Sequence, residues 1–232
     1  MSSFSRHTAD RLVRIPASNA TIVGELFLPD SPTGLVLFVH GAGSGRHSPR
    51  SRKIAEVLTD AGMATLLFDL LTPLEEAEDR WRGHLGFDIS FLAGRLMAAM
   101  DWACESAMTR DLGIGLFGAS TGAAAALLAA AERPLEIQAV VSRGGRPDLV
   151  KEQLPHVVAS TLLIVGENDV PVLGWNRAAA ALLSGEHALH VVAGATHLFP
   201  EQGALEEVSR VTAEWFALHL QRSHPAKSHS SE

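Results

Sequence analysis

Eight short apolar segments, rich in valine, isoleucine, leucine and phenylalanine, recur along the chain with segments of helical spacing between them. Strands buried on both faces of a parallel sheet show such continuous apolar runs, and the connecting helices cover the two faces. The alternation therefore predicts an α/β fold with a mostly parallel, twisted sheet of about eight strands and helices on both faces. The expected strands are residues 11–16, 21–29, 34–40, 64–70, 112–118, 137–142, 161–166 and 188–194.

The first two of these strands are candidates for an antiparallel edge of the sheet. Three of the intervening segments repeat apolar residues at intervals of three and four, which is typical of one buried face of a helix. We interpret these stripes as core, and we interpret Cys104 as a packing residue of the second helix. The stripes are Ile54, Val57, Leu58 and Ala61, then Ile89, Leu92, Leu96, Met100 and Ala103, and then Val208, Val211 and Trp215.

The 232 residues suit one domain, because no repeat and no long internal linker divides them. We expect this domain to cover residues 1–220 and residues 221–232, which are poor in apolar residues, to form a flexible tail. No apolar run reaches the roughly 18 residues of a membrane span, and the N-terminus lacks the apolar part of a secretory signal. We therefore expect no membrane partner and a cytoplasmic location.

The net charge of the chain disfavours one further class of partner. A formal net charge of -7 disfavours broad binding to nucleic acid, which requires a concentrated basic surface. Small molecules are therefore the expected partners. No His, Cys or Asp cluster has the spacing of a metal site, so we expect no metal.

The stretch GASTG, residues 118–122, fits the pattern G-x-S-x-G between an expected strand and an expected helix. In that setting the pattern predicts a sharp turn that holds the serine, here Ser120, exposed as a nucleophile. Glycines flank it because a Cβ at either position would clash with neighbouring backbone. The alternative interpretation is a small-residue turn with a helix-capping serine.

A serine hydroxyl needs a base that removes its proton, and the base needs a carboxylate that orients it. Asp169 follows the strand 161–166, and His197 follows the last expected strand, so both lie at the edge of the sheet where Ser120 is expected. Among the 11 histidines of the chain, His197 is the best candidate for the base. Glu167 and Asp148 remain alternative carboxylates.

The stretch HGAGSG, which begins at residue 40, supplies a glycine-rich turn after the strand 34–40. Such a turn can direct a backbone N–H at the oxyanion of a tetrahedral intermediate, and Ala42 is the expected donor. The backbone N–H of Thr121, at the start of the helix after Ser120, is the expected second donor. A dinucleotide-binding fingerprint is the rival interpretation, but the spacing here is G-x-G-x-G and no lysine follows for a phosphate loop.

The four stretches HGAGSG, GASTG, GENDVP and GATHLF, in this order, resemble the α/β-hydrolase family over roughly residues 20–220, and within it the small, lidless dienelactone hydrolase-like group. The resemblance implies an α/β-hydrolase fold with Ser120 as nucleophile, Asp169 as acid, His197 as base, and Ala42 and Thr121 as oxyanion donors. Dienelactone hydrolases themselves carry cysteine where this chain has Ser120. Two further stretches, GRHSPR and SRGGRPD, resemble hydrolases of this group, some of which are joined to a phosphoribosyltransferase.

These features predict a serine hydrolase that cleaves a carboxylic ester, thioester or lactone of a small molecule through an acyl-enzyme, without a cofactor. The alternative is a catalytically silent α/β-hydrolase fold that serves as a binding or partner module.

Four arginines lie in the two loops GRHSPR and SRGGRPD, which are expected to open on the catalytic edge of the sheet. Because guanidinium groups match carboxylate and phosphate oxygens, an anionic substrate is one interpretation. The other is that these arginines pair with nearby acids such as Asp148 or face solvent. The four candidates are Arg46, Arg50, Arg143 and Arg146.

The long connection 71–88 contains aromatic and apolar residues as well as a run of charges. Trp81, Leu85 and Phe87 could roof a pocket, and the charge run is more typical of a solvated face.

Overall fold

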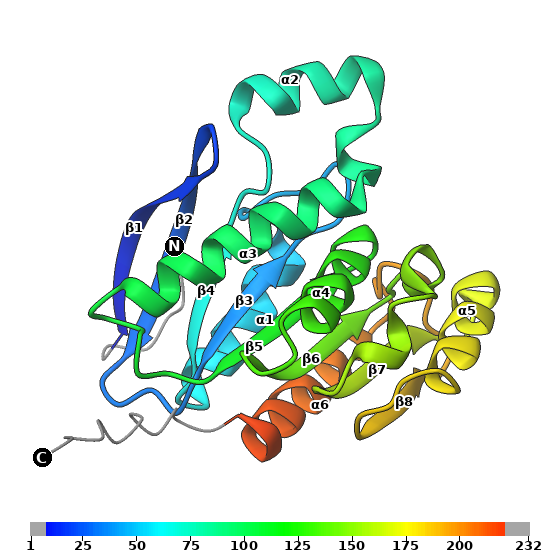
Figure 1. Ribbon diagram of the computed structural model, residues 1–232. Coiled ribbons are helices and arrows are strands. Elements are labelled where there is room, and N and C mark those ends of the chain that lie inside the picture. The colour runs from blue at the N-terminus through cyan, green and yellow to red at the C-terminus, as the bar shows by residue number, and fades with distance from the viewer. Residues whose placement is uncertain (1–7, 221–232) are drawn as a thin grey trace, which may run out of the picture.

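The computed structural model describes residues 8–220, which form an eight-stranded sheet with helices on both faces (Figure 1). The strands are β1 (Thr8–Ala17), β2 (Ala20–Pro29), β3 (Leu35–Val39), β4 (Ala64–Phe68), β5 (Ile114–Ala119), β6 (Ile137–Arg143), β7 (Ser160–Gly166) and β8 (His187–Val192). The α-helices are α1 (Pro49–Asp60), α2 (Pro73–Arg82), α3 (Ile89–Glu105), α4 (Thr121–Glu132), α5 (Val170–Ala180) and α6 (Ala204–His219). The expected tail, residues 221–232, lies outside the described residues.

The strands are ordered β1-β2-β4-β3-β5-β6-β7-β8 across the sheet. The pairs β1–β2 and β2–β4 are antiparallel, and the other five pairs are parallel. Strands β3, β4 and β5 are buried along their whole length, as expected of strands covered on both faces. The predicted α/β architecture with an antiparallel edge at β1 and β2 is therefore confirmed.

Two hydrophobic cores, one on each face of the sheet, hold the helices in place. Helices α3 and α4 pack on one face, where Leu96 and Leu127 are fully buried. Helices α1 and α6 pack on the opposite face, where Leu58 and Phe216 are fully buried. The three predicted helical stripes lie in α1, α3 and α6, except that Ala61 of the first stripe follows the end of α1 and is exposed. No helix among the described residues is long and apolar enough to cross a membrane.

Helix α2 lies within the 71–88 connection, where the sequence analysis predicted no helix. Thr72 and Glu75 form a capping box, in which the Thr72 hydroxyl accepts from the Glu75 N–H while the Glu75 carboxylate accepts from the Thr72 N–H. Pro73 begins the helix, and Gly83 ends it in the left-handed conformation with φ 63°. None of the residues of α2 is buried, and the helix projects away from the sheet (Figure 1).

Two smaller expectations were wrong. Cys104 is exposed rather than packed in the core. Strand β8 ends at Val192, two residues before the expected end, because the chain turns at Gly194 with φ 67°.

Candidate active site

Ser120 occupies the sharp turn between β5 and α4 and has a positive φ of 52°. Non-glycine residues adopt this region rarely and at an energetic cost, and such strain clusters at functional sites. The flanking glycines are sterically required, as expected. A Cβ on Gly118 would lie 2.4 Å from the Cα of Ala123, and one on Gly122 would lie 2.2 Å from the carbonyl oxygen of Val39.

His197 and Asp169 come together from the loops after β8 and β7. The Nδ1 atom of His197 lies 2.6 Å from the Oδ2 atom of Asp169. Asp169 is the N-cap residue of α5, but its side chain makes no capping hydrogen bond and is directed to the histidine. A proton held on Nδ1 by this carboxylate leaves Nε2 free to accept a proton.

The alternative carboxylates are bound elsewhere. Glu167 accepts a hydrogen bond from the backbone N–H of Gly194 at 2.8 Å. Asp148 binds the guanidinium of Arg146 through both of its oxygens. Among the three candidates, the structure therefore pairs only Asp169 with His197.

Ser120 and His197 line one cavity of about 360 Å³ at the carboxyl ends of β3, β5 and β6. No hydrogen bond joins the two side chains in this structure, and such contacts are often long in free enzymes. Gly41 lies close to the serine, because a Cβ on it would come within 3.0 Å of the Ser120 Cβ. Gly144 lies close to the histidine, because a Cβ there would lie 3.3 Å from the His197 Cε1.

The two expected oxyanion donors are adjacent, but one of them is engaged. The backbone N–H of Ala42 donates to the Thr121 hydroxyl at 3.0 Å. The Thr121 N–H lies in the first turn of α4, where backbone N–H groups have no partner within the helix. Sequence analysis missed this bond, because nothing in the local pattern indicates that a side chain 79 residues away meets Ala42.

His40 is buried and joins two loops at the base of the cavity. Its Nε2 accepts a hydrogen bond from the Leu70 N–H at 3.1 Å, and its Nδ1 lies 3.1 Å from the carbonyl oxygen of Gly41, to which it donates. The bond from Leu70 requires the neutral ring, because Nε2 can accept a hydrogen bond only when it carries no proton. Burial lowers the pKa of His40 below 6.5, although the backbone bond to Gly41 opposes this. His40 therefore has a structural role distinct from the base.

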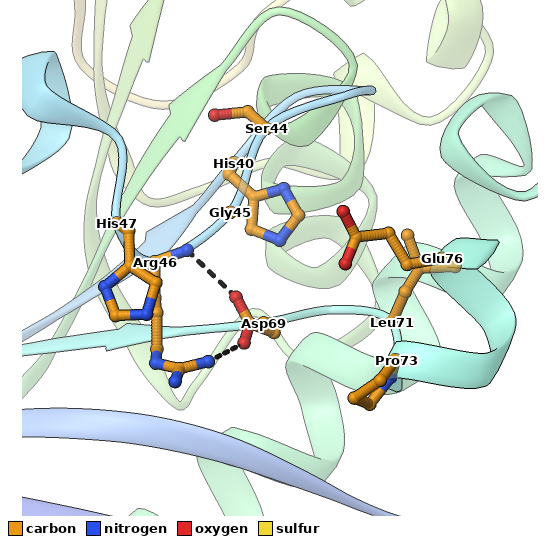
Figure 2. Close-up of a pocket in the computed structure, with 9 residues that line it drawn as sticks. All are labelled: His40, Ser44, Gly45, Arg46, His47, Asp69, Leu71, Pro73 and Glu76. Carbon is orange, nitrogen blue, oxygen red and sulfur yellow. Dashed lines mark hydrogen bonds and ion pairs between the residues drawn. The ribbon is translucent and has the colours of Figure 1, made fainter. Parts of the chain in front are cut away.

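Arg46 and Arg146 are bound to acidic side chains. Figure 2 shows Arg46 directed to Asp69, in a neighbouring cavity that Ser120 does not line, and the same guanidinium also reaches Glu25 at 3.3 Å. The guanidinium of Arg146 donates to both oxygens of Asp148 at 2.9 and 2.8 Å and lies over the Trp175 ring. For these two arginines the structure matches the interpretation of pairing with local acids.

Arg50 and Arg143 are placed differently, because both line the cavity of Ser120 and His197. Arg50 lies in the first turn of α1, and Arg143 is the last residue of β6. Neither forms an ion pair with the described residues, so the structure divides the four arginines into two paired ones and two unpaired ones.

No residue of the 71–88 connection is among those that line the cavity of Ser120. Phe87 lines a hollow beside Ala42 and Gly43, but Trp81 is 90% exposed. Among the described residues, no group of three or more His, Cys, Asp or Glu side chains is arranged to hold a metal ion.

Comparison with known proteins gives three results. No protein-family model matches the chain. The crystal structure of a dienelactone hydrolase from Anabaena variabilis ATCC 29413 is 50% identical, with a TM-score of 0.92 over 93% of this chain and 100% of that chain. The structure of Est1E from Butyrivibrio proteoclasticus is 17% identical, with a TM-score of 0.75 over 89% of this chain and 98% of that chain, and shares the fold.

Two curated proteins of Mycobacterium tuberculosis, from strains CDC 1551 and H37Rv, carry the provisional name phosphoribosyl transferase. Each is 52% identical over 211 residues, which is 91% of this chain and 47% of the relative. The chain thus spans about half the length of these curated relatives.

Proposed function

Because the chain belongs to the dienelactone hydrolase-like group of the α/β-hydrolases, we propose that it is a serine hydrolase of small-molecule carboxylic esters, thioesters or lactones. The observation that carries the proposal is the pairing of His197 with Asp169 at 2.6 Å beside a cavity that both His197 and the strained Ser120 line. The transferase name belongs to relatives of which this chain matches 47%, and our proposal concerns the matched part.

In the proposed reaction, the Ser120 Oγ attacks the carbonyl carbon while its proton passes to the His197 Nε2. The bond from the carbonyl carbon to the leaving group then breaks, and His197 returns the proton to the departing alcohol, thiol or ring oxygen. Water enters, loses a proton to His197 and attacks the carbonyl carbon of the acyl-enzyme. The bond from this carbon to the Ser120 Oγ then breaks, His197 returns the proton to Oγ, and the acid is released. Asp169 keeps the imidazole oriented and stabilises its positive charge.

The proposed oxyanion donors are the N–H groups of Thr121 and Ala42. The first has no acceptor within α4, and the helix dipole at this end also favours negative charge. The second is held by the Thr121 hydroxyl, so it has to exchange that acceptor for the oxyanion as the intermediate forms.

A fluorophosphonate probe tests the nucleophile directly. We expect covalent labelling of the wild-type chain and of Ser44→Ala, since Ser44 lines the same cavity, and no labelling of Ser120→Ala. Ser120→Ala and His197→Ala should each reduce turnover of a 4-nitrophenyl ester by a similar large factor, with little further loss in the double variant, because the residues act as a unit. Equal labelling of wild type and Ser120→Ala would contradict the proposal, and a chain that neither labels nor turns over any ester would favour a silent binding module.

A further inference from the structure

The cavity beside Ser120 is positively charged, although the chain as a whole has a formal net charge of -7. Twelve residues line it, and none of these described residues is Asp or Glu, whereas Arg50 and Arg143 are both among them. The N-terminal ends of two helices also open here, since Arg50 lies in the first turn of α1 and Ser120 precedes α4. Helix N-termini carry partial positive charge and favour anions.

Arg143 is the most unusual of these groups, because it is a buried cation without a counter-charge. Its residue surface is 7% exposed, and its Nε and Nη1 atoms are buried without a hydrogen-bond partner among the described residues. Among the described residues, its one attractive contact is with the Phe199 ring, 5.7 Å from its Cζ. An unpaired buried charge is costly, and it is normally retained only where a partner satisfies it.

Arg50 is a second cation without an ion-pair partner among the described residues, and it supplies no negative charge to Arg143. Its Nε is also buried without a partner. Burial, and then the positive charge of Arg50, lower the pKa of Arg143 to about 10, so its guanidinium remains charged at neutral pH. Two neighbouring cations without a facing carboxylate match an anion of two negative charges better than one of a single charge.

We propose that Arg50 and Arg143 bind a phosphate monoester, and that the natural substrate of the Ser120 site is an ester, thioester or lactone that carries this group. The evidence for the anion site is the two arginines and the two helix N-termini. The role of this site in substrate selection rests on the proposed hydrolase function. A cavity of about 360 Å³ accommodates a small molecule that joins the two groups.

Binding of inorganic phosphate tests the site without requiring catalysis. Phosphate should raise the melting temperature of the wild-type chain in buffers of matched ionic strength, and acetate should do so far less. Arg143→Met and Arg50→Met should each weaken phosphate binding about 10- to 100-fold, as expected when a charge-assisted bond is removed. Arg146→Met is the matched control, because Arg146 is bound to Asp148, and it should bind phosphate like the wild type.

A purely structural role for Arg143 predicts a different result. In that case Arg143→Met would lower the melting temperature equally with and without phosphate, whereas the proposal predicts that only the phosphate-dependent rise is lost. Arg50→Met, on a partly exposed helix turn, keeps the test decisive if Arg143→Met does not fold. No phosphate binding, or acetate binding as tight as that of phosphate, would overturn the proposal.

Three 4-nitrophenyl esters of equal acyl length, ending in phosphate, carboxylate or hydroxyl, test substrate selection. We expect the phosphate ester to have the highest kcat/KM in the wild type. Arg50→Met or Arg143→Met should reduce kcat/KM most for the phosphate ester, less for the carboxylate ester and least for the hydroxyl ester. Equal losses on all three esters, or a preference for the carboxylate, would refute the inference. If phosphate binds through the arginines but no ester is cleaved, the anion site stands and the hydrolase proposal fails.

Discussion

Replacing Gly122 with alanine is expected to damage both the fold and the candidate active site. The new Cβ would lie 2.2 Å from the carbonyl oxygen of Val39 and 2.4 Å from that of His40. Ordinary contacts begin at 3.4 Å, so α4 and β3 have to separate by about 1 Å. The obstructing atoms are backbone at and just after the end of β3, a strand paired on both sides, so no side chain can rotate away to relieve the clash.

The expected cost lies at the upper end of the range for overpacking, about 3 kcal/mol, which corresponds to a melting temperature lower by roughly 6 to 12 °C for a chain of this size. Ser120 lies two residues before the clash, and a displacement of about 1 Å at a reacting group reduces turnover on the order of 100-fold. Thermal unfolding followed by circular dichroism measures the first effect, and ester turnover by the folded variant measures the second.

Gly94→Ala is the matched control, because Gly94 also lies in a helix but has open space around its Cβ position. Alanine there should stabilise α3 by about 0.5 to 1 kcal/mol, since glycine is the weaker helix former, and leave turnover unchanged. A melting temperature of Gly122→Ala within about 2 °C of the wild-type value, together with unchanged turnover, would refute this prediction. Greater damage from Gly94→Ala than from Gly122→Ala would also refute it.

The hydrogen bonds of His40 and Thr121 lead to two further predictions. Burial lowers the pKa of His40 below 6.5 in the folded chain. Between this folded pKa and pH 6.5, the unfolded chain therefore binds a proton that the folded chain does not. The unfolding free energy is fully retained above pH 6.5 and falls as the pH drops through the folded pKa. An NMR titration in which the His40 ring titrates at or above 6.5 would contradict this. Thr121→Val removes the acceptor of the Ala42 N–H and should speed hydrogen exchange of that amide roughly 2- to 10-fold, whereas Thr121→Ser should not. Similar exchange rates in the two variants would show that the hydroxyl bond does not hold the loop.

Features encoded within a few neighbouring residues could be read directly from the sequence. The buried strands were identifiable because burial on both faces requires continuous apolar runs, and the turn at Ser120 because its close backbone contacts exclude any residue but glycine at positions 118 and 122. Helix α2 was also encoded locally, by the capping box of Thr72 and Glu75 and the terminal Gly83, but the charged sequence around these residues obscured it. The ends of the expected strands placed Asp169 and His197 in loops at the same edge of the sheet as Ser120.

Relations between distant groups were decided only by the tertiary structure, because they depend on strand order, loop path and side-chain rotamer together. The sequence left three carboxylates as partners of the base, and the path of the loop after β7 brings Asp169, rather than Glu167 or Asp148, to His197. Four arginines in two similar loops were equivalent by sequence. Two of them meet acidic side chains in the fold. Arg50 and Arg143 do not, and no Asp or Glu is among the described residues that line the cavity they share with Ser120.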